Sequence, residues 1–261
     1  TAASAALAAD RLSRDRVRPT RVGFVGTGLI ARYIHTHLAA TGWLFEETGV
    51  FDLSADSAAG FSGYLERSGT KGRITVHDSA ESLVRSSDLL VFATVAAKPH
   101  IHDPAWFSHA PLVLHVSLRD LAPEILLDSA NFVDDVEHCL KADTSPHLAE
   151  QLTGGRDFLD GTLDDVLCGR VTVPADRTVV FSPFGLGVLD LAVGKFVHDE
   201  VARRSGGDGG QSVEQASVFV KPWQLPHPGG EEGQVGGGKG AGGAQVSIGV
   251  LRVGDGRARY D

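Results

Sequence analysis

The 261-residue sequence contains no methionine and only two cysteines. Cys139 and Cys168 are isolated and show no CxxC spacing, so neither a disulfide framework nor a zinc motif is supported. We expect both to be ordinary thiols. No apolar run approaches the length that spans a bilayer, and the N-terminus carries no secretory hydrophobic block. These absences predict a cytoplasmic protein with no membrane partner.

Basic residues are also outnumbered, with 24 Lys and Arg against 33 Asp and Glu and a net charge of −9. A nucleic-acid partner requires clustered basic residues that neutralise phosphates, and no such cluster is visible. The composition therefore argues against nucleic-acid binding. Apolar residues make up 42% of the chain, which is enough for a buried core in one or two domains.

The two ends of the chain differ from its middle. The alanine-rich segment 1–12 predicts a helix that leads directly into the first strand, and the absent initiator methionine indicates that a preceding segment is missing. From residue 205 onward glycine dominates, and such a composition cannot bury enough surface to offset the entropy of an ordered backbone. We expect a flexible tail or linker over 205–245 and a short strand at 246–253.

The most informative motif is a glycine turn between a strand and a helix. The apolar run 22–25 is followed by Gly26-Thr27-Gly28-Leu29-Ile30-Ala31, which opens an amphipathic stretch over 29–38. In dinucleotide-binding proteins, one glycine makes a tight turn, the next lets the backbone approach a pyrophosphate, and the helix N-terminus supplies free N–H donors. The cofactor contacts predicted here are Gly26, Thr27, Gly28, Leu29 and Ile30.

A second signal is an acidic residue after the next strand. Asp52 follows Val50-Phe51 and lies 24 residues beyond Gly28, close to the spacing of the acid that binds the ribose hydroxyls. We predict NAD rather than NADP, because a carboxylate repels the extra phosphate and no arginine follows it immediately. The alternative is a surface aspartate beside a glycine turn in an unrelated α/β protein.

Strand and helix patterns alternate through the middle of the chain, which favours an α/β fold with a doubly wound parallel sheet of the Rossmann type. Further strands are expected at 73–76, 89–94, 112–117 and 131–133, and helices at 56–67, 79–84 and 123–127. The cofactor should lie across the carboxyl ends of the strands. We therefore predict that Thr94, Val95, Ser117 and Leu118 contact it, although loop residues that merely cap the sheet would show the same pattern.

The adjacent pair Arg119-Asp120 is the best candidate for chemistry. Hydride transfer from a carbon that bears an amine needs a base for the nitrogen proton or a carboxylate that steadies the iminium, and an arginine can hold a substrate carboxylate. Asp120 and Arg119 offer these groups, unless they form a local ion pair without a chemical role. His100 and His102 lack a third ligand, so we predict no metal site.

A strand, a glycine turn and a long helix are expected over 181–201. Asp190 lies in the first turns of that helix, where the helix dipole favours a carboxylate. We predict Asp190 as a third catalytic residue, although stabilisation of the helix would explain it almost as well.

Several segments together resemble the ornithine cyclodeaminase and mu-crystallin family. They are Val22–Ala31, the Ala93-Thr94-Val95-Ala96 loop, the run from His115 to Glu124, Phe132–Asp135 and Gly185–Asp190. Within the family, the SLRDLAPE run at 117–124 is most similar to the dehydrogenase that acts on N-(2-amino-2-carboxyethyl)-L-glutamate, in diaminopropionate biosynthesis for siderophores and peptide antibiotics. The resemblance implies that NAD oxidises the glutamate C–N bond and that water splits the imine into 2,3-diaminopropionate and 2-oxoglutarate.

The resemblance also implies a domain organisation. A preceding domain in the family carries dimer contacts and the basic residues that hold substrate carboxylates, so we expect a homodimer when that domain is present. The predicted parts are a helix from a truncated N-terminal substrate and dimerisation domain (1–20), an NAD-binding Rossmann domain (21–180), a closing C-terminal helix (181–204) and a glycine-rich tail (205–261).

Two other functions stay open within the family. One is an ornithine cyclodeaminase, although such enzymes place a catalytic Asp in a longer loop than the one at 117–122. The other is a catalytically inactive NAD(P)-binding member, as in the mu-crystallin branch. Asp190 matches the family's closing-helix Asp more cleanly than Asp120 matches the loop Asp.

Overall fold

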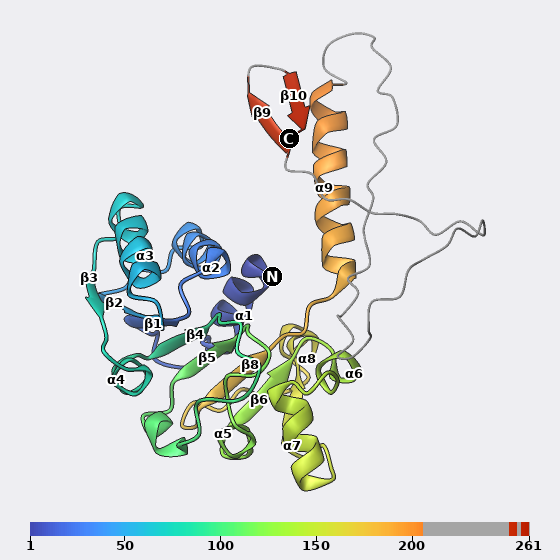
Figure 1. Ribbon diagram of the computed structural model, residues 1–261. Helices are drawn as coiled ribbons and strands as arrows, with labels where there is room; N and C mark the ends of the chain where they lie inside the picture. The colour runs from blue at the N-terminus through green and yellow to red at the C-terminus, as the bar shows by residue number, and fades with distance from the viewer. Residues whose placement is uncertain (206–250, 255–256, 261) are drawn as a thin grey trace, which may run out of the picture. The chain divides into compact units, whose positions relative to one another are not determined.

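The computed structural model describes residues 1–205, 251–254 and 257–260 (Figure 1). The chain forms two compact units, Thr1–Leu186 and Gly187–Asp261. The first unit contains the sheet and every loop that follows its strands. The second unit contains a long helix and a short hairpin.

An eight-stranded sheet in the order β3-β2-β1-β4-β5-β8-β6-β7 forms the centre of the first unit, and all of its strand pairs are parallel. Its strands are β1 (Arg21–Val25), β2 (Glu47–Phe51), β3 (Arg73–Val76), β4 (Leu89–Phe92), β5 (Leu112–His115), β6 (Ala130–Val133), β7 (Leu159–Thr162) and β8 (Val179–Ser182). The chain builds outward from β1 to β3 and then returns to the other side of β1 with β4. This reversal opens a crevice at the carboxyl ends of β1 and β4, where doubly wound sheets bind their ligands.

The central strands are apolar throughout because both faces of the sheet are covered. Successive side chains point to opposite faces, so Phe24 enters one hydrophobic core and Val25 enters the other. Leu89 and Leu90 divide in the same way. The alternation explains why these short segments lack the polar residues of a strand with one wet face.

Helices cover both faces of the sheet (Figure 1). Those whose side chains enter the first core are α1 (Ala2–Leu12), α2 (Leu29–Ala40), α3 (Ala55–Arg67) and α8 (Leu163–Leu167); those in the second are α4 (Ala80–Ser86), the 3-10 helix η1 (Pro104–Phe107), α5 (Pro123–Leu127) and α7 (Ser145–Thr153). The short helix α6 (Val136–Cys139) follows β6. Polar N-caps begin several of them, because a side-chain oxygen accepts from a free N–H of the first turn, as Ser54 does for Ser57.

The predicted Rossmann-type fold is confirmed, with differences at the ends of elements. The strands expected at 89–94 and 112–117 end earlier, at Phe92 and His115, so the residues after them are free to form loops at the crevice. The sequence pattern does not indicate α7 and α8, which are short and begin at the N-caps Thr144 and Thr162 rather than with an apolar period, nor the four-residue strand β7. The expected boundary between 180 and 181 falls within β8.

The N-terminal helix α1 packs as part of the first unit. Its alanines Ala5, Ala8 and Ala9 have no exposed surface and share a core with the sheet. Small side chains let the helix approach closely, which explains the alanine-rich composition of 1–12. Its origin in a preceding domain stays a prediction.

The second unit contains α9 (Gly187–Ser205) and an antiparallel pair of strands, β9 (Leu251–Gly254) and β10 (Arg257–Tyr260). The helix begins at Gly187, so Asp190 lies in its first turn, as expected. The tail expected over 205–245 lies outside the described residues after 205, as does the 246–250 part of the expected strand. No helix in the described ranges is long and apolar enough to cross a membrane.

Candidate functional site: the crevice at the carboxyl ends of the strands

The glycine turn joins the ends of three adjacent strands. Gly26 has a φ of +84° and donates its N–H to the carbonyl of Phe51 in β2 at 3.0 Å. On the other side, Ala93 after β4 donates to the carbonyl of Val25 at 2.9 Å. A Cβ at position 26 would lie 2.8 Å from the Ala93 carbonyl, so only glycine fits there.

Asp52 lies directly against the turn. Its Oδ2 accepts hydrogen bonds from the Thr27 N–H at 2.9 Å and the Thr27 hydroxyl at 2.7 Å, and its Oδ1 accepts from the Ser54 N–H at 2.9 Å. Burial disfavours the charged form, but the hydrogen bonds from Ser54 and Thr27 outweigh it and lower the pKa of Asp52. The carboxylate is therefore ionised at neutral pH, and a carboxylate accepts about four hydrogen bonds, so one position on Oδ1 stays open.

The N-terminus of α2 is uncapped and open. Gly28 is the N-cap residue, no side chain accepts from the first turn, and no atom lies within 4 Å of where its Cβ would be. Leu29 and Ile30 are exposed. Free N–H donors, a favourable helix dipole and an unobstructed approach are the features that bind a phosphate group. The residues present thus fit the pyrophosphate of a dinucleotide.

Exposed apolar side chains stand beside this turn on both flanking strands. Leu53 follows β2 and is 97% exposed, and Val95 follows β4 and is fully exposed. Because β2 and β4 are the two neighbours of β1 in the sheet, these side chains flank the glycine turn. Apolar surface at the rim of a crevice is suited to the flat face of a base.

Asp120 is the hub of a buried polar network below the crevice. Its side chain has no exposed surface, and its Oδ1 accepts from the Thr94 hydroxyl at 2.5 Å and from His100 Nε2 at 2.9 Å. Burial alone would raise the pKa of Asp120, but the hydrogen bond from His100 is the largest of the causes that hold it far below its ordinary value. Contact between this carboxylate and a substrate would require the loop to open.

His115 and Ser182 continue the network into the sheet. The Asp120 N–H donates to His115 Nε2 at 3.2 Å, so Nδ1 carries the proton and donates to Ser182 Oγ at 3.1 Å. Asp120 Oδ2 lies 3.7 Å from His115 Nε2 and has no hydrogen-bond partner among the described residues. Asp120, His115 and Ser182 have the residue types of a catalytic triad but not its function, because an imidazole that donates a hydrogen bond to the serine cannot remove the serine's proton.

Arg119 does not pair with Asp120, so the local ion pair considered from the sequence is absent. Its guanidinium donates to the carbonyls of Ala142 at 2.6 Å and Asp143 at 3.0 Å. Both of these residues have positive φ, 56° and 52°. The arginine therefore supports a strained turn, and the prediction that it holds a substrate carboxylate stays untested.

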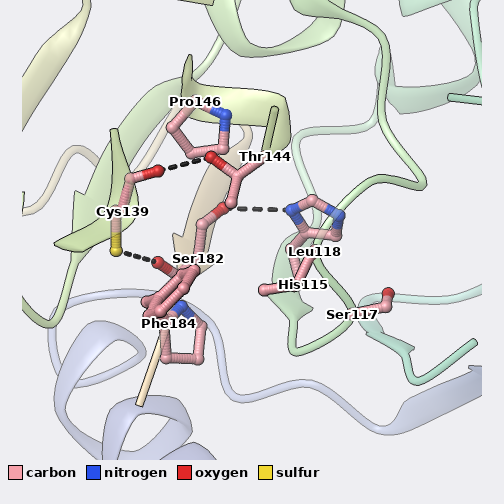
Figure 2. A pocket seen from close by; sticks show the side chains of 9 residues that line it. His115, Ser117, Leu118, Cys139, Thr144, Pro146, Ser182 and Phe184 are labelled. Carbon is pink, nitrogen blue, oxygen red and sulfur yellow. Dashed lines mark hydrogen bonds between the residues drawn. The ribbon is translucent and has the colours of Figure 1, made fainter. Parts of the chain in front are cut away.

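A small pocket lies where β5, β8 and the start of α7 meet (Figure 2). Its volume is about 10 Å³, room for one water molecule. Its lining includes the predicted cofactor contacts Ser117 and Leu118, together with His115, Cys139, Thr144, Pro146, Ser182, Pro183 and Phe184. Cys139 donates to the Ser182 carbonyl, and burial is the first cause that raises the pKa of this thiol to about 12. The thiol is therefore protonated and unreactive.

Asp134 fixes the loop after β8. Its carboxylate accepts from the N–H groups of Phe184 at 3.0 Å and Gly185 at 2.7 Å.

Asp190, the third predicted catalytic residue, is exposed in the first turn of α9 in the second unit. The described residues contain no group of three His, Cys, Asp or Glu that could hold a metal ion.

Sequence reasoning missed three members of the network, His100, His115 and Ser182. In the sequence, His100 stands out only beside His102, as a pair too small to bind a metal. The signal for its role is the T-x₅-H spacing from Thr94, because the loop between them brings both side chains to the Asp120 carboxylate. His115 and Ser182 end strands that are adjacent in the sheet but 67 residues apart in the sequence. No local pattern brings them together.

Residues 1–205 match the model of the ornithine cyclodeaminase/mu-crystallin family. The chain belongs to this family. Among curated relatives, it is 28% identical over 207 residues to the nodulation efficiency protein NfeD of Rhizobium meliloti, a match that covers 76% of this chain and 60% of that protein. The family assignment agrees with the motifs at the crevice.

Solved structures of similar fold extend the comparison. The crystal structure of CmnK is 33% identical, with a TM-score of 0.65 over 83% of this chain and 66% of that one. The Δ¹-pyrroline-2-carboxylate reductase of Thermococcus litoralis, solved with NADH and L-proline, has a TM-score of 0.68 at 20% identity, over 78% of this chain and 65% of the other. The chain spans about 60% to two thirds of the length of these proteins.

Proposed function

We propose that this chain is the dinucleotide-binding part of an NAD-dependent oxidoreductase that acts on the C–N bond of an amino acid. The observation that carries the proposal is the glycine turn with an open α2 N-terminus and an ionised Asp52 beside it. When bound, NAD would supply a hydride acceptor. Family membership and the similar reductase solved with NADH support the same chemistry.

The chain's own residues have distinct tasks in this proposal. The N–H groups at the start of α2 hold the pyrophosphate, and the open position on Asp52 Oδ1 accepts from a ribose hydroxyl. Leu53 and Val95 cover the base. Thr94, Ser117 and Leu118 place the nicotinamide half toward β5, and the ionised Asp52 disfavours the additional phosphate of NADP.

The substrate we propose is N-(2-amino-2-carboxyethyl)-L-glutamate, oxidised and hydrolysed to 2,3-diaminopropionate and 2-oxoglutarate. The SLRDLAPE run at 117–124 supports this choice, and the short loop it forms keeps Asp120 tied to Thr94 and His100. A diaminopropionate product suits the synthesis of siderophores or peptide antibiotics. Formation of proline from ornithine without net NADH would instead place the chain with the cyclodeaminases.

Calorimetric titration of the chain with NAD and with NADP tests the cofactor assignment. We expect NAD to bind more tightly, and Asp52→Ala to weaken NAD binding by about 1–3 kcal/mol, the value of a charged hydrogen bond. Asp56→Ala is the matched control, because Asp56 is a nearby exposed aspartate outside the turn. Equal loss in both variants, or unchanged affinity in Asp52→Ala, would remove the basis for the assignment.

A further inference from the structure

Oxidation of an amine requires a group that accepts the nitrogen proton, and the polar side chains at the centre of the network are already occupied. Asp120 is fully buried, and both nitrogens of His115 are engaged by Asp120 and Ser182. The Arg119 guanidinium is a donor only and is bound to backbone carbonyls. Among the described residues of the first unit, this leaves exposed side chains near the crevice as candidates for the proton acceptor.

His100 has the geometry of such an acceptor. Its Nε2 lies 2.9 Å from Oδ1 of the ionised Asp120, which only accepts, so Nε2 carries the proton. Its Nδ1 then has a free lone pair, with no partner among the described residues, and the side chain is 38% exposed. A buried carboxylate that fixes the tautomer of a partly exposed imidazole is the arrangement that orients a general base.

The imidazole is held close to the predicted cofactor contacts. Thr94 donates to the same Oδ1 as His100, so the His100 ring lies beside the loop that follows β4. The backbone is fixed as well, because the N–H groups of His100 and Ile101 both donate to the Asp120 carbonyl at 3.0 Å. The ring is thus anchored through its side chain and its main chain to one residue.

We propose that His100 is the proton acceptor of the reaction and that Asp120 is its positioning residue. The inference rests on the proposed amine oxidation. A bound NAD would accept the C–H electron pair as hydride, the N–H electron pair would become the second bond of C=N, and the released proton would bind His100 Nδ1. From there it passes to solvent, because the ring is exposed.

The first test reads the tautomer of His100 in the wild-type chain without cofactor. Two-bond ¹H–¹⁵N correlation of histidine-labelled protein at pH 8 should show His100 with Nε2 protonated and Nδ1 unprotonated. His102, exposed and outside the network, is the internal control and should populate both tautomers. A proton on Nδ1 of His100 would overturn the proposal.

The second test follows a single turnover of hydride transfer from N-(2-amino-2-carboxyethyl)-L-glutamate to NAD. His100→Gln keeps a donor for Asp120 but cannot accept a proton, so its rate should fall by on the order of 100-fold. His102→Gln should stay near the wild-type rate, NAD affinity should be the same in all three proteins, and added imidazole should restore part of the rate to His100→Ala.

The outcomes separate the two proposals. Absence of NAD binding by the wild-type chain refutes the proposed function and the role of His100 with it. Turnover by wild type that His100→Gln and His102→Gln match equally refutes the role of His100 alone. If the wild-type chain binds NAD without turnover, the tautomer measurement decides.

Discussion

Substitution by alanine should affect a different property at each glycine of the turn, the stability of the fold at Gly26 and the affinity for NAD at Gly28. Gly26→Ala places a methyl group in a left-handed conformation, φ +84°, and within 2.9 Å of the Ala93 carbonyl and the Thr94 nitrogen. All of these neighbours are backbone atoms of the loop directly after β4, which is hydrogen-bonded to β1 through Ala93, so none can rotate away as a side chain can. We expect the substitution to destabilise the fold.

The magnitude follows from two costs. A residue with a Cβ in the left-handed region costs about 1–2 kcal/mol, and forcing extra volume into a packed site costs about 1–3 kcal/mol. Gly26→Ala should therefore lower the free energy of unfolding by about 2–5 kcal/mol, a large part of the total for a domain of ordinary stability.

Gly28→Ala should leave stability nearly unchanged. Its φ is −70°, which alanine adopts without strain, and no atom lies within 4 Å of the new methyl group. The entropy that alanine removes from the unfolded chain offsets its poorer N-capping, so the net change should stay within about 1 kcal/mol. The methyl group does stand where the backbone must approach a pyrophosphate, and NAD affinity should fall at least about tenfold.

Urea unfolding with linear extrapolation measures the first quantity, and calorimetric titration with NAD measures the second. A loss of stability in Gly28→Ala equal to that in Gly26→Ala would refute the distinction between a crowded and an open glycine. NAD affinity in Gly28→Ala equal to that of wild type would show that the pyrophosphate does not approach this backbone.

Further predictions concern stability away from the turn. Arg16 donates to the carbonyls of Ala110, Pro174 and Arg177, so Arg16→Ala should cost about 2–4 kcal/mol in urea unfolding, and a change below about 0.5 kcal/mol would contradict this. Burial lowers the pKa of His35 in the folded protein, so as the pH falls the unfolded chain takes up this proton before the folded one. The contribution of His35 to the free energy of unfolding is therefore fully present above a pH of about 6.5 and is lost as the pH falls through the lower folded pKa. His35→Gln should flatten the dependence of this free energy on pH below about 6.5, and an unchanged slope would assign the dependence to other groups. Asp134→Ala should leave the N–H groups of Phe184 and Gly185 unpaired and accelerate their hydrogen exchange at least about tenfold, while exchange in β1 stays slow. Equal exchange rates at Phe184 and Gly185 in the variant and the wild type would show that the Asp134 carboxylate does not hold the loop after β8.

Features that depend on neighbours in the chain were predictable from the sequence. The turn at Gly26 and Gly28 follows from local backbone requirements, and Asp52 follows from the short distance along the chain to the next strand. The helix over Pro123–Leu127 has the predicted bounds because proline begins it and its apolar residues face one core. Alternating strands and helices likewise predicted the parallel sheet.

The tertiary structure alone decided which residues share the site. β8 comes late in the sequence yet lies between β5 and β6, and this insertion brings Ser182 to His115. Asp120 reads as an exposed loop residue in the sequence, but the return of the 94–101 loop covers it and leaves His100 at the surface. Burial and long-range hydrogen bonds depend on how strands are ordered in space, and the residue pattern around each one does not contain that order.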